Sequence, residues 1–173
     1  MWFRKPPPIR LPLTVVVLSP NRTRYALDRV DAMMGDSVLF WDDVGITLQP
    51  TVRGLVSPNT VPSNWGDFLH DLHRWEIGTP KPTIYVMSGL DYIVGLGLGA
   101  AWPHLGLAVV AGMAPGASTD KLINHELSHL CGLGHDAPGE HTFMAAALET
   151  SNRVVSTKQK LTILENAHRL GGF

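Results

Sequence analysis

The sequence predicts one α/β domain (α+β in some schemes) built on a mixed, twisted, largely parallel sheet of about five strands covered by helices. Short β-branched or apolar runs alternate with segments of helical periodicity, which is typical of strands joined by crossover helices. The 173 residues are 45% hydrophobic, enough for one buried core. Neither an internal repeat nor a linker divides the chain, so residues 1–173 are expected to form one domain.

Each expected element follows from a local pattern. Three consecutive prolines predict an extended start over residues 1–11. Pro20 suits the first turn of a first helix, and Gly35 marks its stop. Pro50 places its strand at an edge or a bulge. The expected strands lie at residues 13–18, 44–53, 83–88, 93–102 and 105–112. The expected helices lie at about 20–35, 64–76, 119–131 and 156–169.

Composition excludes several classes of partner. The net charge is −1 and the basic residues are scattered, which argues against nucleic acid as a ligand. No apolar run approaches the roughly 20 residues of a spanning helix, so we expect no membrane insertion. We also expect a monomer. The apolar stretch 11–18 lacks a small-residue cleavage site after it, so a signal peptide is not favoured. The compartment stays open: either cytoplasmic or secreted by an unrecognised route.

The residues that carry chemistry lie in the run HELSHLCGLGHD, which begins at His125. His125 and His129 are four residues apart, so on a helix they share one face within reach of one metal ion. Glu126 projects about 100° round that helix and lies beside the ion. If the helix continued, His135 would lie about 9 Å further along its axis. Gly132 can take the left-handed conformation that ends a helix, so the chain turns back and brings His135 to the other two.

Three neutral imidazoles and a water form an open catalytic zinc site. The competing interpretation is a polar, solvated helix with incidental histidines. Apolar residues make this helix too hydrophobic for that interpretation, because three bare histidines would then be buried without partners. The apolar residues are Leu122, Ile123, Leu127 and Leu130.

The same run resembles the long zinc signature HExxHxxGxxH of the metzincin metallopeptidases. Asp136, directly after the third histidine, resembles the adamalysin (reprolysin) branch, and the resemblance implies that it anchors the chain below the zinc. It also implies a methionine-containing turn beneath the ion, for which Met144 is the candidate. The resemblance is strong over about 105–146. Ala146 stands where the astacin-like and serralysin-like members have a tyrosine, so no tyrosine ligand is expected.

The resemblance implies a zinc-dependent endopeptidase with one catalytic Zn²⁺ held by the three histidines, in which Glu126 activates a zinc-bound water. It places the peptide or protein substrate along an antiparallel edge strand above the active-site helix. The candidate strand is 95–102, with 106–111 as the alternative edge. The implied substrate-binding residues are Gly97, Leu98, Gly99 and Ala100, together with Ala145, Ala146 and Ala147 in a pocket wall. It further implies an amino-terminal subdomain, residues 1–134, and a small carboxy-terminal subdomain, residues 135–173, with a final helix.

Two other functions stay open. The first is a zinc-binding structural or virion module without turnover, which would have no need of Glu126. The second is a zinc amidase acting on a small molecule, since HExxH also serves hydrolases other than peptidases. Such enzymes lack the glycine turn followed by a third histidine.

Overall fold

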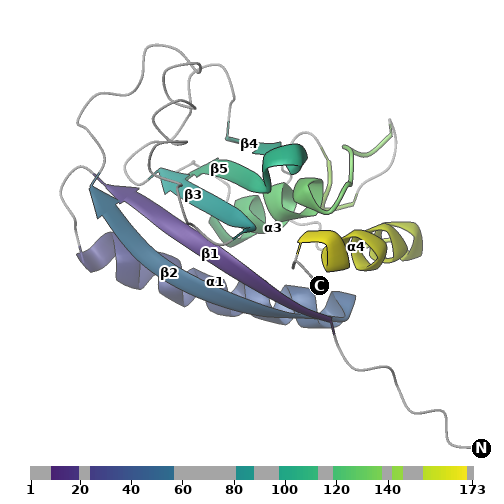
Figure 1. Ribbon diagram of the computed structural model, residues 1–173, viewed down its shortest axis with the longest axis horizontal. Coiled ribbons are helices and arrows are strands. Elements are labelled where there is room, and N and C mark those ends of the chain that lie inside the picture. The colour runs from purple at the N-terminus through teal and green to yellow at the C-terminus, as the bar shows by residue number, and fades with distance from the viewer. Residues whose placement is uncertain are drawn as a thin grey trace, which may run out of the picture.

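The computed structural model describes residues 9–19, 24–56, 81–87, 98–112, 119–137, 142–145 and 154–170. Within these ranges, five strands form one twisted mixed sheet and three α-helices pack against it (Figure 1), which confirms the predicted fold class. The strands are β1 (Ile9–Ser19), β2 (Ile46–Val56), β3 (Thr83–Met87), β4 (Gly99–Trp102) and β5 (Leu107–Ala111). The helices are α1 (Arg24–Val44), α3 (Thr119–Leu130) and α4 (Thr157–Leu170), with a short 3₁₀ turn at Pro103–Leu105.

The strand order is β2-β1-β3-β5-β4. All neighbours are parallel except β4, which runs antiparallel to β5. The interior strands β3 and β5 are buried at every position, as expected for strands covered on both faces. The edge strand β4 is half-buried throughout. The prediction of an antiparallel edge strand at 95–102 is therefore confirmed for residues 99–102, which form β4.

Two expectations from the sequence are wrong. The alternative edge strand at 106–111 is interior, because β5 pairs with β3 on one side and with β4 on the other. Gly35 does not end the first helix, which continues to Val44. One face of α1 stays buried beyond the glycine, at Ser37 and Trp41. That packing offsets the roughly 1 kcal/mol that a glycine costs inside a helix.

Pro50 and Gly45 act as the chemistry of these residue types predicts. Pro50 lies in β2, which is a sheet edge among the described strands. An edge strand tolerates proline, because it has a neighbouring strand on only one side to which an N–H could donate. Gly45 ends α1 with φ of +102°, and its N–H donates to the carbonyls of Trp41 and Asp42. The helix expected at 64–76 and the extended start at 1–8 lie outside the described residues.

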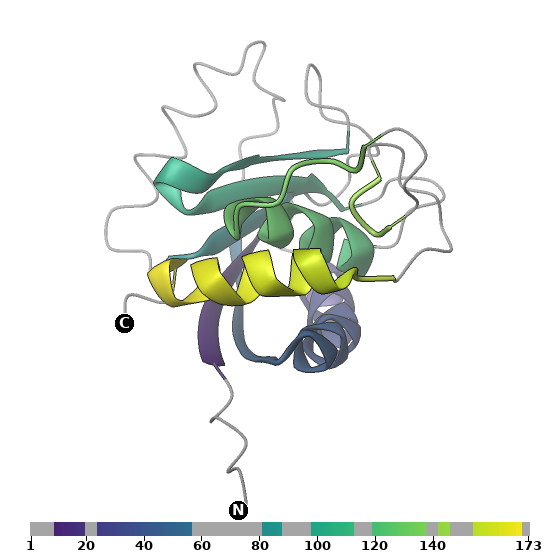
Figure 2. The same ribbon diagram turned by 90° about the vertical axis from the view of Figure 1, so that its right-hand side faces the viewer.

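Helices α1 and α3 lie side by side against the sheet, and α3 packs beneath β4 and β5 (Figures 1 and 2). One buried hydrogen bond joins the two helices: Trp41 Nε1 donates to Asn124 Oδ1 over 3.1 Å. The helix α4 packs against β1, and its Leu164 lies next to Gly45. No described helix has the length and apolar character needed to cross a bilayer. The fold thus places α3, with its histidines, directly under the sheet edge formed by β4.

Candidate metal centre

Three histidine side chains converge at the carboxyl end of α3. His125 and His129 lie one turn apart on the helix, and their Nε2 atoms are 3.1 Å apart. His135 comes from the segment after the helix, and its Nε2 is 3.2 Å from that of His129. His125 is buried, His129 half-buried and His135 exposed. The structure therefore brings together the three histidines that the spacing predicted, with one side of the cluster open to solvent.

The end of α3 explains how the third histidine reaches the other two. Gly132 has φ of +84°, the left-handed conformation that glycine adopts without steric cost. The N–H of Leu133 donates to the carbonyl of Ser128 over 3.0 Å, and the N–H of Gly132 donates to that of His129 over 2.9 Å. This pair of bonds is the Schellman arrangement that closes a helix. The chain then reverses direction and carries His135 back toward the helix.

Backbone carbonyls hold two of the rings from behind. His125 Nδ1 is 3.1 Å from the carbonyl oxygen of Phe143, and His129 Nδ1 is 2.6 Å from that of Leu133. With its proton on Nδ1, each ring donates to its carbonyl and turns the lone pair of Nε2 toward the cluster. Hydrogen bonds of this kind orient the histidine ligands of metals. The helix end thus has two roles, since Leu133 both closes α3 and orients His129.

The donor set fits tetrahedrally coordinated zinc. Zinc–nitrogen distances of about 2.0–2.1 Å in a tetrahedron separate the ligand nitrogens by about 3.3–3.4 Å, close to the 3.1 and 3.2 Å observed. One ligand atom from each ring lies within 4.8 Å of the others. Burial lowers the pKa of His125 to about 4 and also lowers that of His129. Both rings are therefore neutral at physiological pH, the form that binds metal.

Glu126 lies on α3 beside the cluster and is buried. Its Oε2 is enclosed without a hydrogen-bond partner among the described residues. Burial raises the pKa of this carboxyl group from 4.5 to about 8. A buried carboxylate with an unused oxygen is a strong proton acceptor next to a metal site.

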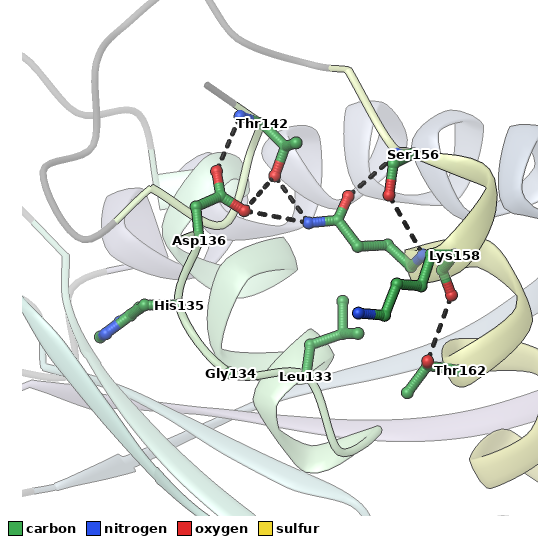
Figure 3. Close-up of a pocket in the computed structure, with 9 residues that line it drawn as sticks. Leu133, Gly134, His135, Asp136, Thr142, Ser156, Lys158 and Thr162 are labelled. Atoms are coloured by element: carbon green, nitrogen blue, oxygen red, sulfur yellow. Dashed lines mark hydrogen bonds between the residues drawn. The ribbon is translucent and has the colours of Figure 1, made fainter. Parts of the chain in front are cut away.

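Asp136 ties the segment after His135 to the turn that contains Met144 (Figure 3). Its Oδ2 accepts from the backbone N–H of Thr142 over 2.7 Å, and its Oδ1 accepts from the Thr142 hydroxyl over 2.6 Å. Its own N–H donates to the carbonyl of Met144 over 3.1 Å. Met144 is fully buried. These bonds fix the chain directly after His135 against the turn that contains Met144.

Gln159 of α4 completes this network (Figure 3). Its Nε2 donates to Asp136 Oδ1 over 3.1 Å and to Thr142 Oγ1 over 2.7 Å. Its Oε1 accepts from the N–H of Ser156, while the Ser156 hydroxyl accepts from the N–H of Gln159. That reciprocal pair is a capping box at the start of α4. A pocket of about 400 Å³ lies between this helix end and the 133–136 segment, with the His135 side chain pointing away from it.

The expected substrate-binding residues divide into two groups. Leu98, Gly99 and Ala100 lie at the start of β4, and Gly99 lies directly against the carboxylate of Glu126. Ala145 follows Met144 in the described turn and is half-buried. Gly97, Ala146 and Ala147 lie outside the described residues.

The sequence did not predict the supporting residues that lie outside the run HELSHLCGLGHD. The Ser156-x-x-Gln159 spacing is a capping-box signal that could have marked the start of α4, but not its bonds to Asp136. The carbonyl of Phe143 and the Trp41–Asn124 bond carry no signal in the sequence, because both depend on how distant elements pack.

Comparison with known proteins shows which structures share this fold. Neither a protein-family model nor a curated protein sequence matches the chain. Among solved structures, archaemetzincin from Methanopyrus kandleri is 18% identical with a TM-score of 0.61, over 95% of this chain and 98% of that one. A zinc-dependent peptidase from Methanocorpusculum labreanum is 15% identical with a TM-score of 0.54, and the match covers 87% of this chain and 99% of that chain.

Metalloproteinase-II from Bacteroides fragilis is a further structural neighbour. It is 18% identical with a TM-score of 0.62, and the match covers 91% of this chain and 53% of that one. At these identities the similarity establishes a shared fold. The chain therefore has the fold of zinc-dependent peptidases, and its three clustered histidines could bind zinc.

Proposed function

We propose that the protein is a zinc-dependent endopeptidase with one catalytic zinc ion. The observation that carries the proposal is the position of Glu126 beside three converging imidazole nitrogens, as a buried carboxyl group with one oxygen that has no partner among the described residues. A site that only held zinc for structural reasons would gain nothing from burying that carboxyl group at such cost. The peptidases among the structural neighbours agree with this class of reaction.

In this proposal His125, His129 and His135 hold the ion, which, when bound, polarises the scissile carbonyl and lowers the pKa of water toward about 7. Glu126 accepts a proton from the attacking water and passes it to the nitrogen of the leaving amine. Burial raises the pKa of this group in the metal-free site, and the positive charge of a bound zinc ion would favour the carboxylate form that accepts the proton.

An extended peptide would bind along β4. Only one side of this strand pairs within the described sheet, so its other backbone edge can pair with a substrate strand. Leu98, Gly99 and Ala100 lie where such a peptide would pass. Ala145, with Ala146 and Ala147 after it, would line an apolar pocket for bulky hydrophobic side chains on the primed side. A cleavage profile dominated by charged primed residues would contradict that assignment.

The finer classification belongs to the same proposal. Asp136 after the third histidine favours the adamalysin-like branch of the metzincins, and Met144 is proposed to lie beneath the ion. Residues 1–173 would form one monomeric catalytic domain, with subdomains 1–134 and 135–173 on either side of the metal centre.

The proposed activity is tested with casein and a library of quenched peptides of six to ten residues, alongside small N-acyl amides. The zinc-loaded protein should cleave internal bonds of the peptides, a chelator should abolish cleavage, and added zinc should restore it. Cleavage confined to the small amides would favour an amidase. Stable zinc binding with no hydrolysis of any substrate would favour a structural module.

A further inference from the structure

Gly99 opens the edge strand β4 directly above α3. It pairs with Val110 of β5, and the carbonyl of the preceding Leu98 accepts from the N–H of Ala111 over 2.8 Å. These two contacts with β5 fix the distance between β4 and α3 at this position. The strand therefore cannot rise away from α3 at this position without breaking its pairing with β5.

A side chain at Gly99 would have no space unless the end of the Glu126 side chain moved. A Cβ atom built there would lie 2.5 Å from Glu126 Oε1, 3.0 Å from its Cδ and 3.0 Å from the carbonyl oxygen of Val109. Contacts below 3.0 Å essentially never occur for real Cβ atoms, and 3.4 Å is an ordinary contact. No other described glycine comes as close to a neighbouring atom. By contrast, Gly35 and Gly134 have nothing within 4 Å.

Backbone conformation does not explain this glycine. The φ angle of Gly99 lies outside the left-handed range that favours glycine, unlike those of Gly106 and Gly132. An alanine could adopt the same backbone. What requires glycine here is the space taken by the carboxylate.

Among the described residues, packing contacts and not hydrogen bonds hold the buried Oε2 of Glu126 in place. Its Oε2 is enclosed and has no hydrogen-bond partner among the described residues, although the side chain is only 5% exposed. The position of the carboxylate therefore depends on the surfaces around it. Gly99 provides one of those surfaces at its closest point.

We propose that Gly99 is a positioning residue for Glu126: its missing side chain leaves the space in which the general base lies. This inference rests on the proposed peptidase function and deepens it. A methyl group at position 99 would push the carboxylate away by about 0.5–0.9 Å to restore contacts of 3.0–3.4 Å. Displacements of this size in an active site lower rates by up to about 100-fold.

The test is a double-mutant cycle that combines Gly99→Ala with Glu126→Asp, whose carboxylate is one methylene shorter and leaves the space free. With zinc content verified as equal, Gly99→Ala should lower kcat for a quenched peptide by about 30- to 100-fold with KM changed less than about threefold. In the Glu126→Asp background the same change should lower kcat by less than about fivefold. Gly54→Ala, in the edge strand β2, is the matched control and should have the same effect in both backgrounds.

Equal losses in the two backgrounds would overturn the proposal, since they would show that the methyl group only distorts β4 against the Val109 carbonyl. Undiminished kcat in Gly99→Ala would overturn it as well. A crystallographic comparison of the zinc-free proteins keeps the question separate from peptidase activity. The proposal requires the Glu126 carboxylate to shift by about 0.5 Å or more in Gly99→Ala while β4 stays in place. Movement of the strand with an unmoved carboxylate would contradict it, whether or not the wild type cleaves peptides.

Discussion

Gln159→Glu should weaken zinc binding although residue 159 lies on a different helix from two of the three histidines. The substitution is isosteric. It replaces the Nε2 donor by an oxygen, so the bonds of 3.1 Å to Asp136 Oδ1 and 2.7 Å to Thr142 Oγ1 are changed. The capping bond from the N–H of Ser156 to Oε1 can persist. Only the link between α4 and the segment after His135 is therefore perturbed.

The size of the effect follows from the contacts. Two partly buried hydrogen bonds, one of them to a carboxylate, contribute about 2–4 kcal/mol together. At pH 8 the introduced carboxylate would also lie about 3 Å from that of Asp136, a repulsion of roughly 5 kcal/mol at an effective dielectric constant of 20. The 135–136 segment relieves this repulsion by moving away from α4. Since losing the outer partners of a metal site typically costs 10- to 100-fold in affinity, the Kd for zinc should rise at least tenfold.

The assay is zinc competition against a chromophoric chelator at pH 8, combined with urea unfolding of each metal-free protein. Ser156→Ala is the matched control, because it removes the acceptor of the Gln159 N–H, at a cost of about 1 kcal/mol, but leaves the bonds to Asp136 and Thr142. Zinc affinity should fall in Gln159→Glu and stay unchanged in Ser156→Ala. Wild-type zinc affinity in Gln159→Glu, or an equal loss of zinc affinity in both variants, would show that the bonds from Gln159 to Asp136 and Thr142 do not support the metal centre.

Three further predictions concern the metal-free protein, measured by urea unfolding in chelator. Gly132→Ala should cost about 1–2 kcal/mol, because φ is +84° and the new methyl group would lie 3.2 Å from Asn166 Nδ2. Trp41→Phe should cost about 1–3 kcal/mol, because it leaves Asn124 Oδ1 buried without its donor. Burial raises the pKa of Glu126 from 4.5 to about 8, so the folded state keeps a proton that the unfolded chain releases in this window. The unfolding free energy of the wild type, taken relative to that of Glu126→Gln, should therefore fall by up to about 5 kcal/mol as pH rises from 4.5 to 8.

Each of these has a clear contrary result. An unchanged unfolding free energy in Gly132→Ala would mean that the left-handed turn is not needed to end α3. The same result in Trp41→Phe would mean that the buried bond between α1 and α3 contributes nothing. Parallel pH profiles of wild type and Glu126→Gln would mean that the Glu126 carboxyl is not desolvated.

The metal centre is the part of the structure that the sequence predicts best, because its geometry is local. His125 and His129 are related by helical periodicity, and Gly132 is the residue that a chain reversal toward His135 requires. The five strands were predictable for a similar reason, since apolar runs such as 13–18 suit only a buried position. Their order was less accessible, and β5 was considered as a possible edge although it is interior.

Long-range packing decided what the sequence left open. Nothing near Gly35 indicates that helix α1 continues, because the compensating burial at Trp41 depends on α3 from the other half of the chain. The family resemblance in the sequence places Gly99 only among the implied substrate-binding residues. In the structure, the carboxylate of Glu126 also occupies the place that a side chain at position 99 would take.

A comparison of the wild type with Glu126→Gln decides whether Glu126 makes the proposed zinc site catalytic. Wild type and Glu126→Gln are loaded with zinc, their metal content is measured by atomic emission, and cleavage of the same peptide library is followed. Both proteins should hold one zinc ion per chain, since Glu126 is not a ligand, and the variant should lose at least about 1,000-fold in kcat/KM. Equal cleavage by the two proteins, or a wild type that binds zinc and cleaves no peptide, would contradict a catalytic role for Glu126.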